Sequence, residues 1–220
     1  MRQLIRWVRN SPPRLRFLLG AMTVPPTRPP AAVPPPHGRK RLLVVCDANV
    51  SRGPCAAALL QRYLDADGWQ VVSAGTDAID GAPVSDTMRA AASERDIDLG
   101  GHRAVRVSAD LLRSADLIIA MSHRESAKLL ALEPAMQRRV RLLGGFDPHP
   151  RGCEMVRDGL AAGQEIPDPA GGGIELHREC CRRLELGVAQ LARWLGRREA
   201  SRSSPTPRLS APALGVSRLR

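Results

Sequence analysis

Short apolar runs alternate with helical patterns through the middle of this chain. Four of these runs have the length and the β-branched or leucine-rich composition of buried strands, and each is followed by a segment with helical spacing of its apolar residues. We expect strands at 41–46, 69–75, 115–121 and 139–144, and helices at 54–65, 85–96, 123–132 and 173–195. Such alternation requires parallel strands joined by right-handed crossovers. The predicted fold class is therefore α/β, a doubly wound sheet of four parallel strands with helices on both faces.

The two ends of the chain differ from this middle part. Residues 24–37, "VPPTRPPAAVPPPH", are so rich in proline that we expect an extended linker. The last residues are rich in Ser, Pro and Arg and poor in clustered apolar residues. We therefore predict a basic, disordered extension over 1–38, a folded domain over 39–196 and a basic, disordered tail over 197–220.

The net charge of +11 belongs to the ends. Residues 1–41 hold nine Lys and Arg and no acid, and residues 197–220 hold six Arg and one Glu, so the segment between them carries a net charge of −3. A folded nucleic-acid-binding domain needs a basic face of its own. We therefore expect no nucleic acid as a partner of the folded domain, whereas the tails could contact anionic surfaces weakly.

Five cysteines form an odd set without the paired spacing of a zinc site or a disulfide framework. A reducing, cytoplasmic compartment is the natural interpretation. The N-terminal segment "MRQLIRWVRNSPPRLRFLLGAM" is too short in its apolar stretches to span a bilayer, for which about 20 apolar residues are needed. A peripheral membrane or targeting role for this segment stays open beside a plain disordered tail.

The stretch "VVCDANVSRGP" follows the first predicted strand and precedes a helix. In open α/β sheets ligands bind at the carboxyl ends of strands, and a loop there directs backbone N–H groups and a helix dipole at an anion. A cysteine in such a loop, beside an arginine, is expected to have a low pKa and to act as a nucleophile. By itself the pattern is weak, since a lone cysteine at the end of a buried strand is structural more often than catalytic.

The longer stretch "LLVVCDANVSRGPCAAALL" resembles the phosphate-binding loop of low-molecular-weight protein-tyrosine phosphatases, whose pattern is V-C-x-G-N-x-C-R-S-P. The matching residues are Val45, Cys46, Asn49, Arg52 and Pro54. The segment "EIPDPAGG" (165–172) resembles the Asp-Pro loop of the same family, and "VVSAGT", "DIDLGGHRA", "ADLIIAMSHRE" and "LLGGFDP" align in order between the two. The resemblance covers about residues 41–195. The same scaffold also occurs in arsenate reductases.

The resemblance implies a phosphatase that forms a cysteinyl-phosphate and uses neither a metal nor another cofactor. Cys46 would be the nucleophile, Arg52 would hold the phosphoryl oxygens, and Asp168 would be the general acid, although Asp-Pro is also common in surface turns. His102 and Ser73 would support the loop through Asn49, with a surface or capping role as the alternative for His102. The remaining phosphate-binding loop residues would be Asp47, Ala48, Asn49, Val50, Ser51 and Gly53.

This sequence departs from the family pattern at four places. Ala48 replaces a glycine, and it would strain the loop if that position has a positive φ. Gly53 replaces a Ser or Thr whose hydroxyl steadies the sulfur, so we expect a less acidic Cys46 and slower breakdown of the phosphoenzyme. Ser51 replaces a second cysteine that protects the nucleophile from oxidation. The run Ala170–Gly173 replaces aromatic residues that stack on a phosphotyrosine ring.

Two other functions remain as alternatives, the first because of Ala48 and Gly53 and the second because arsenate reductases share the scaffold. One is a phosphate-binding or regulatory protein with little turnover, and the other is an arsenate reductase. The absence of cysteines between Cys55 and Cys153 argues against an internal cysteine relay for arsenate reduction. We expect the substrate to be a phosphorylated protein or a small phosphomonoester.

Overall fold

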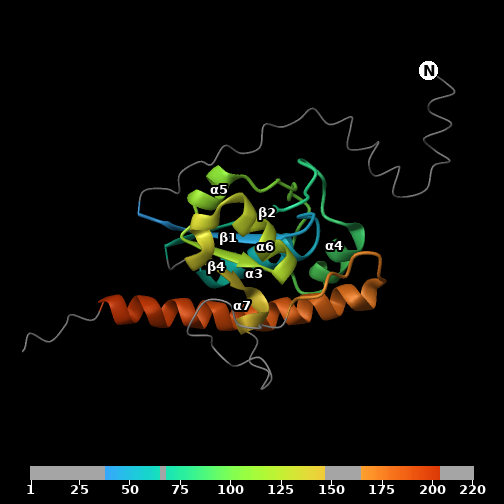
Figure 1. Cartoon of the computed structure of the whole chain (residues 1–220). Helices are drawn as coiled ribbons and strands as arrows, with labels where there is room; N and C mark the ends of the chain where they lie inside the picture. The colour runs from blue at the N-terminus through green and yellow to red at the C-terminus, as the bar shows by residue number, and fades with distance from the viewer. Residues whose placement is uncertain (1–37, 65–67, 147–164, 204–220) are drawn as a thin grey trace, which may run out of the picture.

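The computed structural model describes residues 38–64, 68–146 and 165–203, and within them the chain forms one parallel sheet (Figure 1). Its four strands lie in the order β2-β1-β3-β4. They are β1 (Lys40–Cys46), β2 (Trp69–Gly75), β3 (Leu117–Ala120) and β4 (Val140–Leu142). The predicted fold class is confirmed.

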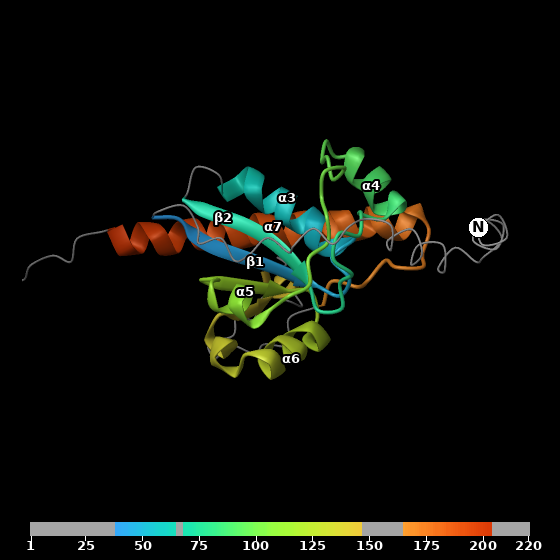
Figure 2. The same cartoon turned by 90° about the horizontal axis from the view of Figure 1, so that it is seen from above.

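Helices cover both faces of the sheet. Seen from above, α3, α4 and α7 lie on one side and α5 and α6 on the other (Figure 2). Their bounds are Arg52–Leu64 for α3, Asp86–Ser93 for α4, Ala109–Arg113 for α5, His123–Leu132 for α6 and Ile174–Ser203 for α7. Two 3-10 turns, η2 (Pro134–Arg138) and η3 (Leu143–Phe146), flank β4.

Strand β1 lies in the centre of this arrangement and is buried on both faces. Leu42, Val44 and Cys46 pack into the apolar cluster of α3, α4 and α7, whereas Leu43 and Val45 pack into the cluster of α5 and α6. Burial of each such Leu or Val side chain contributes about 1.5–3 kcal/mol. A shift of one residue would exchange the two faces, so packing fixes the register and places Cys46 at the carboxyl end of β1.

Three helices begin at a serine that caps the first turn. The hydroxyl oxygens of Ser85, Ser108 and Ser122 accept hydrogen bonds from the backbone N–H groups of the residues three positions later, at the starts of α4, α5 and α6. The predicted cap at Ser85 is confirmed. Helix α5 was not expected from the sequence, although Ser108 marks its start.

The bounds of several elements differ from the expectation. Helix α4 ends at Ser93, and the chain then turns through Asp96, which has a φ of 56°. Strands β3 and β4 are shorter than expected because a 3-10 turn follows β4 directly and loop residues flank β3. Helix α7 runs to Ser203, so the boundary expected at 196 falls inside a helix.

The predictions of disorder fall mostly on residues outside the described part of the chain, 1–37 and 204–220, and Cys153 lies outside it as well. Within the tail predicted over 197–220, residues 197–203 are helical instead, because they continue α7. Among the described residues, none of the helices combines the length and the apolar character needed to cross a bilayer.

Candidate active site

The loop between β1 and α3 begins at Cys46 and ends at Arg52, the first residue of α3. The loop follows β1, the strand that pairs with β2 on one side and with β3 on the other. Cys46, Asn49 and Arg52 are all buried. The backbone N–H groups of Asn49 and Gly53 donate toward the sulfur of Cys46. The predicted phosphate-binding loop is thus wrapped around the predicted nucleophile.

Burial raises the pKa of the Cys46 thiol to about 11. Arg52 and the two backbone N–H groups act in the opposite direction, and the charge of Glu125 adds to the rise. The raised pKa agrees in direction with the less acidic Cys46 expected for this chain, and it differs from the low pKa that the helix dipole, the arginine and the loop N–H groups favour in such a loop. Removal of the sulfur from water outweighs these favourable charges.

Gly53 donates its backbone N–H toward the sulfur but has no side-chain hydroxyl group to add a second donor. A Cβ atom at Gly53 would lie 3.0 Å from Cys46 Sγ and 3.1 Å from Asn49 Nδ2. A serine at this position would therefore place its hydroxyl beside the sulfur. In the family pattern a Ser or Thr hydroxyl would occupy this place beside the sulfur.

Asn49 shapes the loop through its backbone and its side chain. Its φ of 56° lies in the left-handed region, which asparagine tolerates better than most residues. Its Nδ2 donates to Ser73 Oγ at 3.0 Å, and its Oδ1 accepts from the backbone N–H of Val105 at 3.0 Å. Ala48 has no positive φ, so the expected strain at Ala48 is absent.

His102 also reaches the loop. Its Nε2 lies 3.0 Å from the carbonyl oxygen of Asn49, which requires that this nitrogen carry the proton and donate it. Burial lowers the pKa of His102, which favours the neutral ring. His102 and Ser73 thus both contact Asn49, as the resemblance implied, but His102 contacts the backbone of Asn49 rather than its side chain.

Gly75, the last residue of β2, lets two backbone segments approach each other. A Cβ atom at this position would lie 2.4 Å from the carbonyl oxygen of Asp47 and 2.9 Å from the backbone nitrogen of Asn49. The loop therefore rests directly on the end of β2. Sequence reasoning aligned the segment around Gly75 with the family but assigned this glycine no role.

Arg52 joins the loop to a segment far along the chain. Its Nη1 donates to the carbonyl oxygen of Ile166 at 3.0 Å, and its Nη2 donates to Asp168 Oδ2 at 2.5 Å. The same Nη2 lies 3.0 Å from Glu125 Oε1. The structure thus brings together Cys46, Arg52 and Asp168, and it adds a buried carboxylate, Glu125, that the sequence analysis did not single out.

The segment that carries Asp168 is attached at the carboxyl end of β3, an interior strand of the sheet. The backbone N–H of Ile166 donates to the carbonyl oxygen of Met121, just after β3, and Glu165 accepts from the backbone N–H of His123. Asp168 itself is 40% exposed, and its second oxygen accepts from the backbone N–H of Ala170. The carboxylate is therefore held at the mouth of the site but remains open to solvent.

The other predicted loop residues have distinct surroundings. Asp47 is partly exposed and lies 3.7 Å from Lys128 Nζ. Val50 packs against a small apolar cluster beyond β2. The hydroxyl of Ser51 is buried and has no hydrogen-bond partner within the described part of the chain. Cys55 lies with its sulfur 3.9 Å from that of Cys181.

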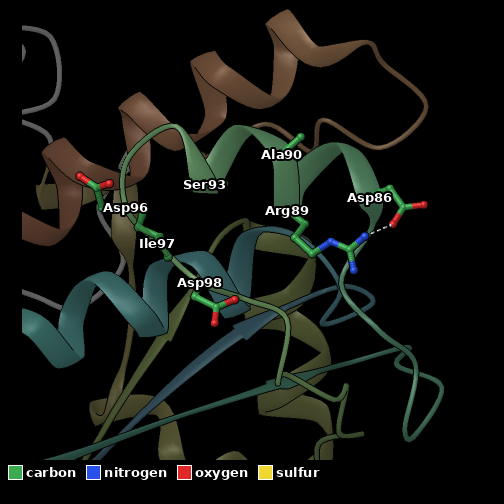
Figure 3. A pocket seen from close by; sticks show the side chains of 7 residues that line it. All are labelled: Asp86, Arg89, Ala90, Ser93, Asp96, Ile97 and Asp98. Atoms are coloured by element: carbon green, nitrogen blue, oxygen red, sulfur yellow. Dashed lines mark hydrogen bonds and ion pairs between the residues drawn. The ribbon is translucent and has the colours of Figure 1, made fainter.

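A separate depression of about 700 Å³ lies beside α4 and the turn that follows it (Figure 3). Its charged lining consists of Asp86, Asp96, Asp98 and Arg89, and Arg89 is already paired with Asp86 at 2.8 Å. None of its lining residues belongs to the loop around Cys46. Its acidic lining makes it a poor place for a phosphate group.

The site around Cys46 combines the groups that phosphoryl transfer needs. The sulfur of Cys46 receives two backbone N–H groups, the buried guanidinium group of Arg52 interacts with it, and the partly exposed carboxylate of Asp168 pairs with Arg52. Among the described residues, no group of three or more His, Cys, Asp and Glu side chains is arranged to hold a metal ion.

Comparisons with known proteins agree with this geometry. Residues 41–201 match the model of the family described as low molecular weight phosphotyrosine protein phosphatase. The chain is 37% identical over 128 residues to the low molecular weight protein-tyrosine-phosphatase Wzb of Escherichia coli K12. The aligned residues make up 58% of this chain and 76% of Wzb. It is 33% identical to the probable phosphatase EpsP of Ralstonia solanacearum, over 56% of this chain and 87% of EpsP.

A solved structure shows the same fold. The YwlE arginine phosphatase from Geobacillus stearothermophilus superposes with a TM-score of 0.65 at 26% identity, over 76% of this chain and 99% of that one. Cysteine-based hydrolysis of phosphate monoesters is typical of the matched family. The chain therefore belongs to the low molecular weight phosphotyrosine protein phosphatase family, and it is a cysteine-dependent hydrolase of phosphate monoesters.

Proposed function

We propose that Cys46, Arg52 and Asp168 carry out this hydrolysis in two steps. The observation that carries the proposal is that Arg52 lies in the same loop as Cys46 and contacts Asp168, although 116 residues separate Arg52 from Asp168 in the sequence. Two-step displacement needs a nucleophile, an anion-binding cation and a proton donor at one place.

In the first step the sulfur of Cys46 bonds to phosphorus while the bond from phosphorus to the ester oxygen breaks. Arg52 and the loop N–H groups hold the three remaining phosphoryl oxygens. Asp168 gives its proton to the leaving oxygen, which departs as an alcohol or phenol. Since the pKa of Cys46 is about 11 in the free site, the thiol proton must pass to solvent or to the substrate dianion before the sulfur attacks.

In the second step Asp168, now a carboxylate, takes a proton from water as the water oxygen bonds to phosphorus. The bond between sulfur and phosphorus breaks, and inorganic phosphate leaves. The sulfur must depart as a thiolate, and here it lacks a hydroxyl donor from Gly53. We expect this second step to limit turnover.

The substrate class that we propose is phosphotyrosine in proteins, with weak selection for the aromatic ring. The residues after Pro169 are Ala170, Gly171, Gly172 and Gly173, so this segment offers no ring for stacking. Leu176, which is 58% exposed and packs against Gly172, is an apolar side chain next to this segment. Aryl and alkyl phosphates should therefore differ mainly in the acidity of their leaving groups.

The test is hydrolysis of 4-nitrophenyl phosphate and of a phosphotyrosine peptide under reducing conditions. We expect Cys46→Ser to abolish release of phosphate and Asp168→Asn to lower kcat about 10²- to 10⁴-fold. If wild type and Cys46→Ser release phosphate at the same background rate, the proposal fails. Assays with phosphoserine and phosphoarginine test which leaving groups the enzyme accepts. Phosphoarginine is included because the structural neighbour YwlE is an arginine phosphatase.

A second candidate is a phosphate-binding protein with slow turnover, and Gly53 is the observation that favours it. Rapid mixing distinguishes the two. A stoichiometric burst of nitrophenol followed by almost no further release would show that the phosphoenzyme forms and persists. Because a slow second step gives a burst in either case, continued steady release of nitrophenol after the burst would exclude this candidate.

A further inference from the structure

Glu125 is a buried carboxylate that contacts the phosphate-binding arginine. It lies in the first turn of α6 and is only 2% exposed. Its Oε1 lies 3.0 Å from Arg52 Nη2, and the Arg52 side chain is buried as well. Removing both charges from water costs several kcal/mol per ion, so a pair of this kind persists only with good geometry and further hydrogen bonds.

The hydroxyl of Ser122 supplies such a hydrogen bond. Ser122 Oγ donates to Glu125 Oε2 at 2.6 Å, and the same oxygen caps α6 by accepting from the backbone N–H of Glu125. In an ordinary capping box the acidic side chain returns to the backbone N–H of the capping residue. Here one carboxylate oxygen contacts the hydroxyl of Ser122 and the other contacts Arg52, so the side chain is aimed into the site.

Arg52 therefore has two acidic partners that differ in accessibility. Both Asp168 and Glu125 contact its Nη2, but Asp168 is 40% exposed and Glu125 is 3% exposed by side chain. In the proposed reaction Asp168 must turn to the leaving oxygen and carry a proton, so it has to give up its ion pair with Arg52. Glu125 has no path to solvent and no role at the leaving group, which leaves it in contact with Arg52.

We propose that Glu125 is a positioning residue that holds the guanidinium group of Arg52 in its phosphate-binding orientation while Asp168 exchanges partners. This inference rests on the proposed function of Arg52 and Asp168. A guanidinium group has to present a planar pair of donors to two phosphoryl oxygens, so its orientation matters as much as its charge. The carbonyl oxygen of Ile166 holds Nη1, and Glu125 holds Nη2.

The negative charge of Glu125 is unfavourable for anion binding, and this distinguishes a positioning role from a role through charge alone. Its negative charge opposes a phosphate dianion and raises the pKa of Cys46. If the carboxylate acted only through its charge, its removal would help anion binding and thiolate formation. A loss of activity on its removal would therefore report a loss of orientation.

The experiment compares kcat and KM for 4-nitrophenyl phosphate in wild type, Glu125→Gln and Glu133→Gln. Glu133 follows the same helix and pairs with the surface residue Arg113, so it is the matched control. We expect Glu125→Gln to lower kcat about 10- to 100-fold with KM changed by less than about 3-fold. We expect Glu133→Gln to keep the wild-type values.

A double-mutant cycle with Arg52→Lys shows whether Glu125 acts through Arg52. If it does, Glu125→Gln causes little further loss when Arg52 is already Lys. Thermal unfolding of each variant shows whether a fall in kcat reflects loss of folded protein, and kcat is therefore expressed per folded molecule. An unchanged kcat in Glu125→Gln, or an equal loss in both Arg52 backgrounds, would overturn the inference. Failure of the proposed function would appear instead as equal rates for wild type and Cys46→Ser.

Discussion

Arg52 Nη2 lies 2.5 Å from Asp168 Oδ2, so the arginine that we propose to bind phosphate is paired with the residue that we propose as the general acid. An entering phosphoryl group must take the place of this carboxylate. The exchange is feasible because Asp168 is 40% exposed and its charge can be solvated when it leaves. Substrate binding and release of the acid from Arg52 are then one event.

The first prediction follows from this competition. Asp168→Asn removes the charge that competes for Arg52, so orthovanadate should bind about 2- to 5-fold more tightly, a range that is small because the pair is partly exposed. The same variant should hydrolyse phenyl phosphate much more slowly than wild type. Titration calorimetry with vanadate measures the first effect. Asp86→Asn, which removes an exposed ion pair with Arg89, is the control.

The second prediction concerns the hydroxyl group missing at Gly53. Gly53→Ser should lower the pKa of Cys46 and speed decay of the phosphoenzyme, because one hydrogen bond to a charged sulfur contributes about 1.5–3 kcal/mol. The added Cβ would lie 3.0 Å from the sulfur, so Sγ must move by a few tenths of an ångström. Gly53→Ala carries the same crowding without the hydroxyl. A higher kcat for Ser than for Ala confirms the prediction, and equal values contradict it.

The fold could be predicted from the sequence because each strand and helix has its own short apolar pattern and the strand–helix unit repeats along the chain. Strand β1 is apolar throughout, and the loop residues from Cys46 to Pro54 carry a contiguous pattern. Asp168 could be placed only by the family resemblance, since nothing in its own surroundings indicates that it meets Arg52.

The roles of Glu125 and Gly75 could not be predicted from the sequence, for physical reasons. Ser122 to Glu125 has the spacing of an ordinary helix cap, and only the tertiary structure shows that the carboxylate turns to Arg52 instead. Gly75 ends a strand, a common place for glycine, and the backbone that it touches belongs to a different segment. The rise in the pKa of Cys46 has burial as its largest cause, and the extent of burial cannot be read from the sequence, whereas the charges that favour the thiolate can.

The third prediction is the pH dependence of thiol reactivity. Only the thiolate reacts with iodoacetamide, and a pKa of about 11 means that the thiolate fraction of Cys46 keeps rising through the neutral and mildly alkaline range. Alkylation should therefore accelerate about tenfold per pH unit between pH 7 and pH 10, with no plateau. Mass spectrometry of the Cys46 peptide follows the reaction. A plateau below pH 8 would show that the sulfur is already ionised in the free enzyme.

The fourth prediction concerns oxidation of the nucleophile. Ser51 occupies the loop position where the family pattern has a second cysteine, and Cys55 faces Cys181 at 3.9 Å. Cys180 interacts with Cys46 through its charge, but burial raises the pKa of its thiol to about 12, so it supplies little thiolate to form a disulfide with an oxidised Cys46. Peroxide should therefore take Cys46 beyond sulfenic acid to sulfinic and sulfonic acids, and dithiothreitol should not restore activity. Ser51→Cys should make the loss of activity reversible. Recovery of the wild-type enzyme, with Cys46 found in a disulfide-linked peptide, would contradict the prediction.

The last prediction tests the close contact between Gly75, at the end of β2, and the loop that follows β1. Gly75→Ala would place a Cβ atom 2.4 Å from the carbonyl oxygen of Asp47, and since the neighbouring atoms are backbone, only the whole loop can move. We expect a loss of about 1–3 kcal/mol in the free energy of unfolding and a larger loss of activity, because the displaced N–H groups no longer converge on the phosphoryl oxygens. Gly101→Ala is the matched control, since nothing lies within 4 Å of the added atom. If Gly75→Ala unfolds at the wild-type temperature with wild-type kcat, the loop does not depend on β2 for its shape.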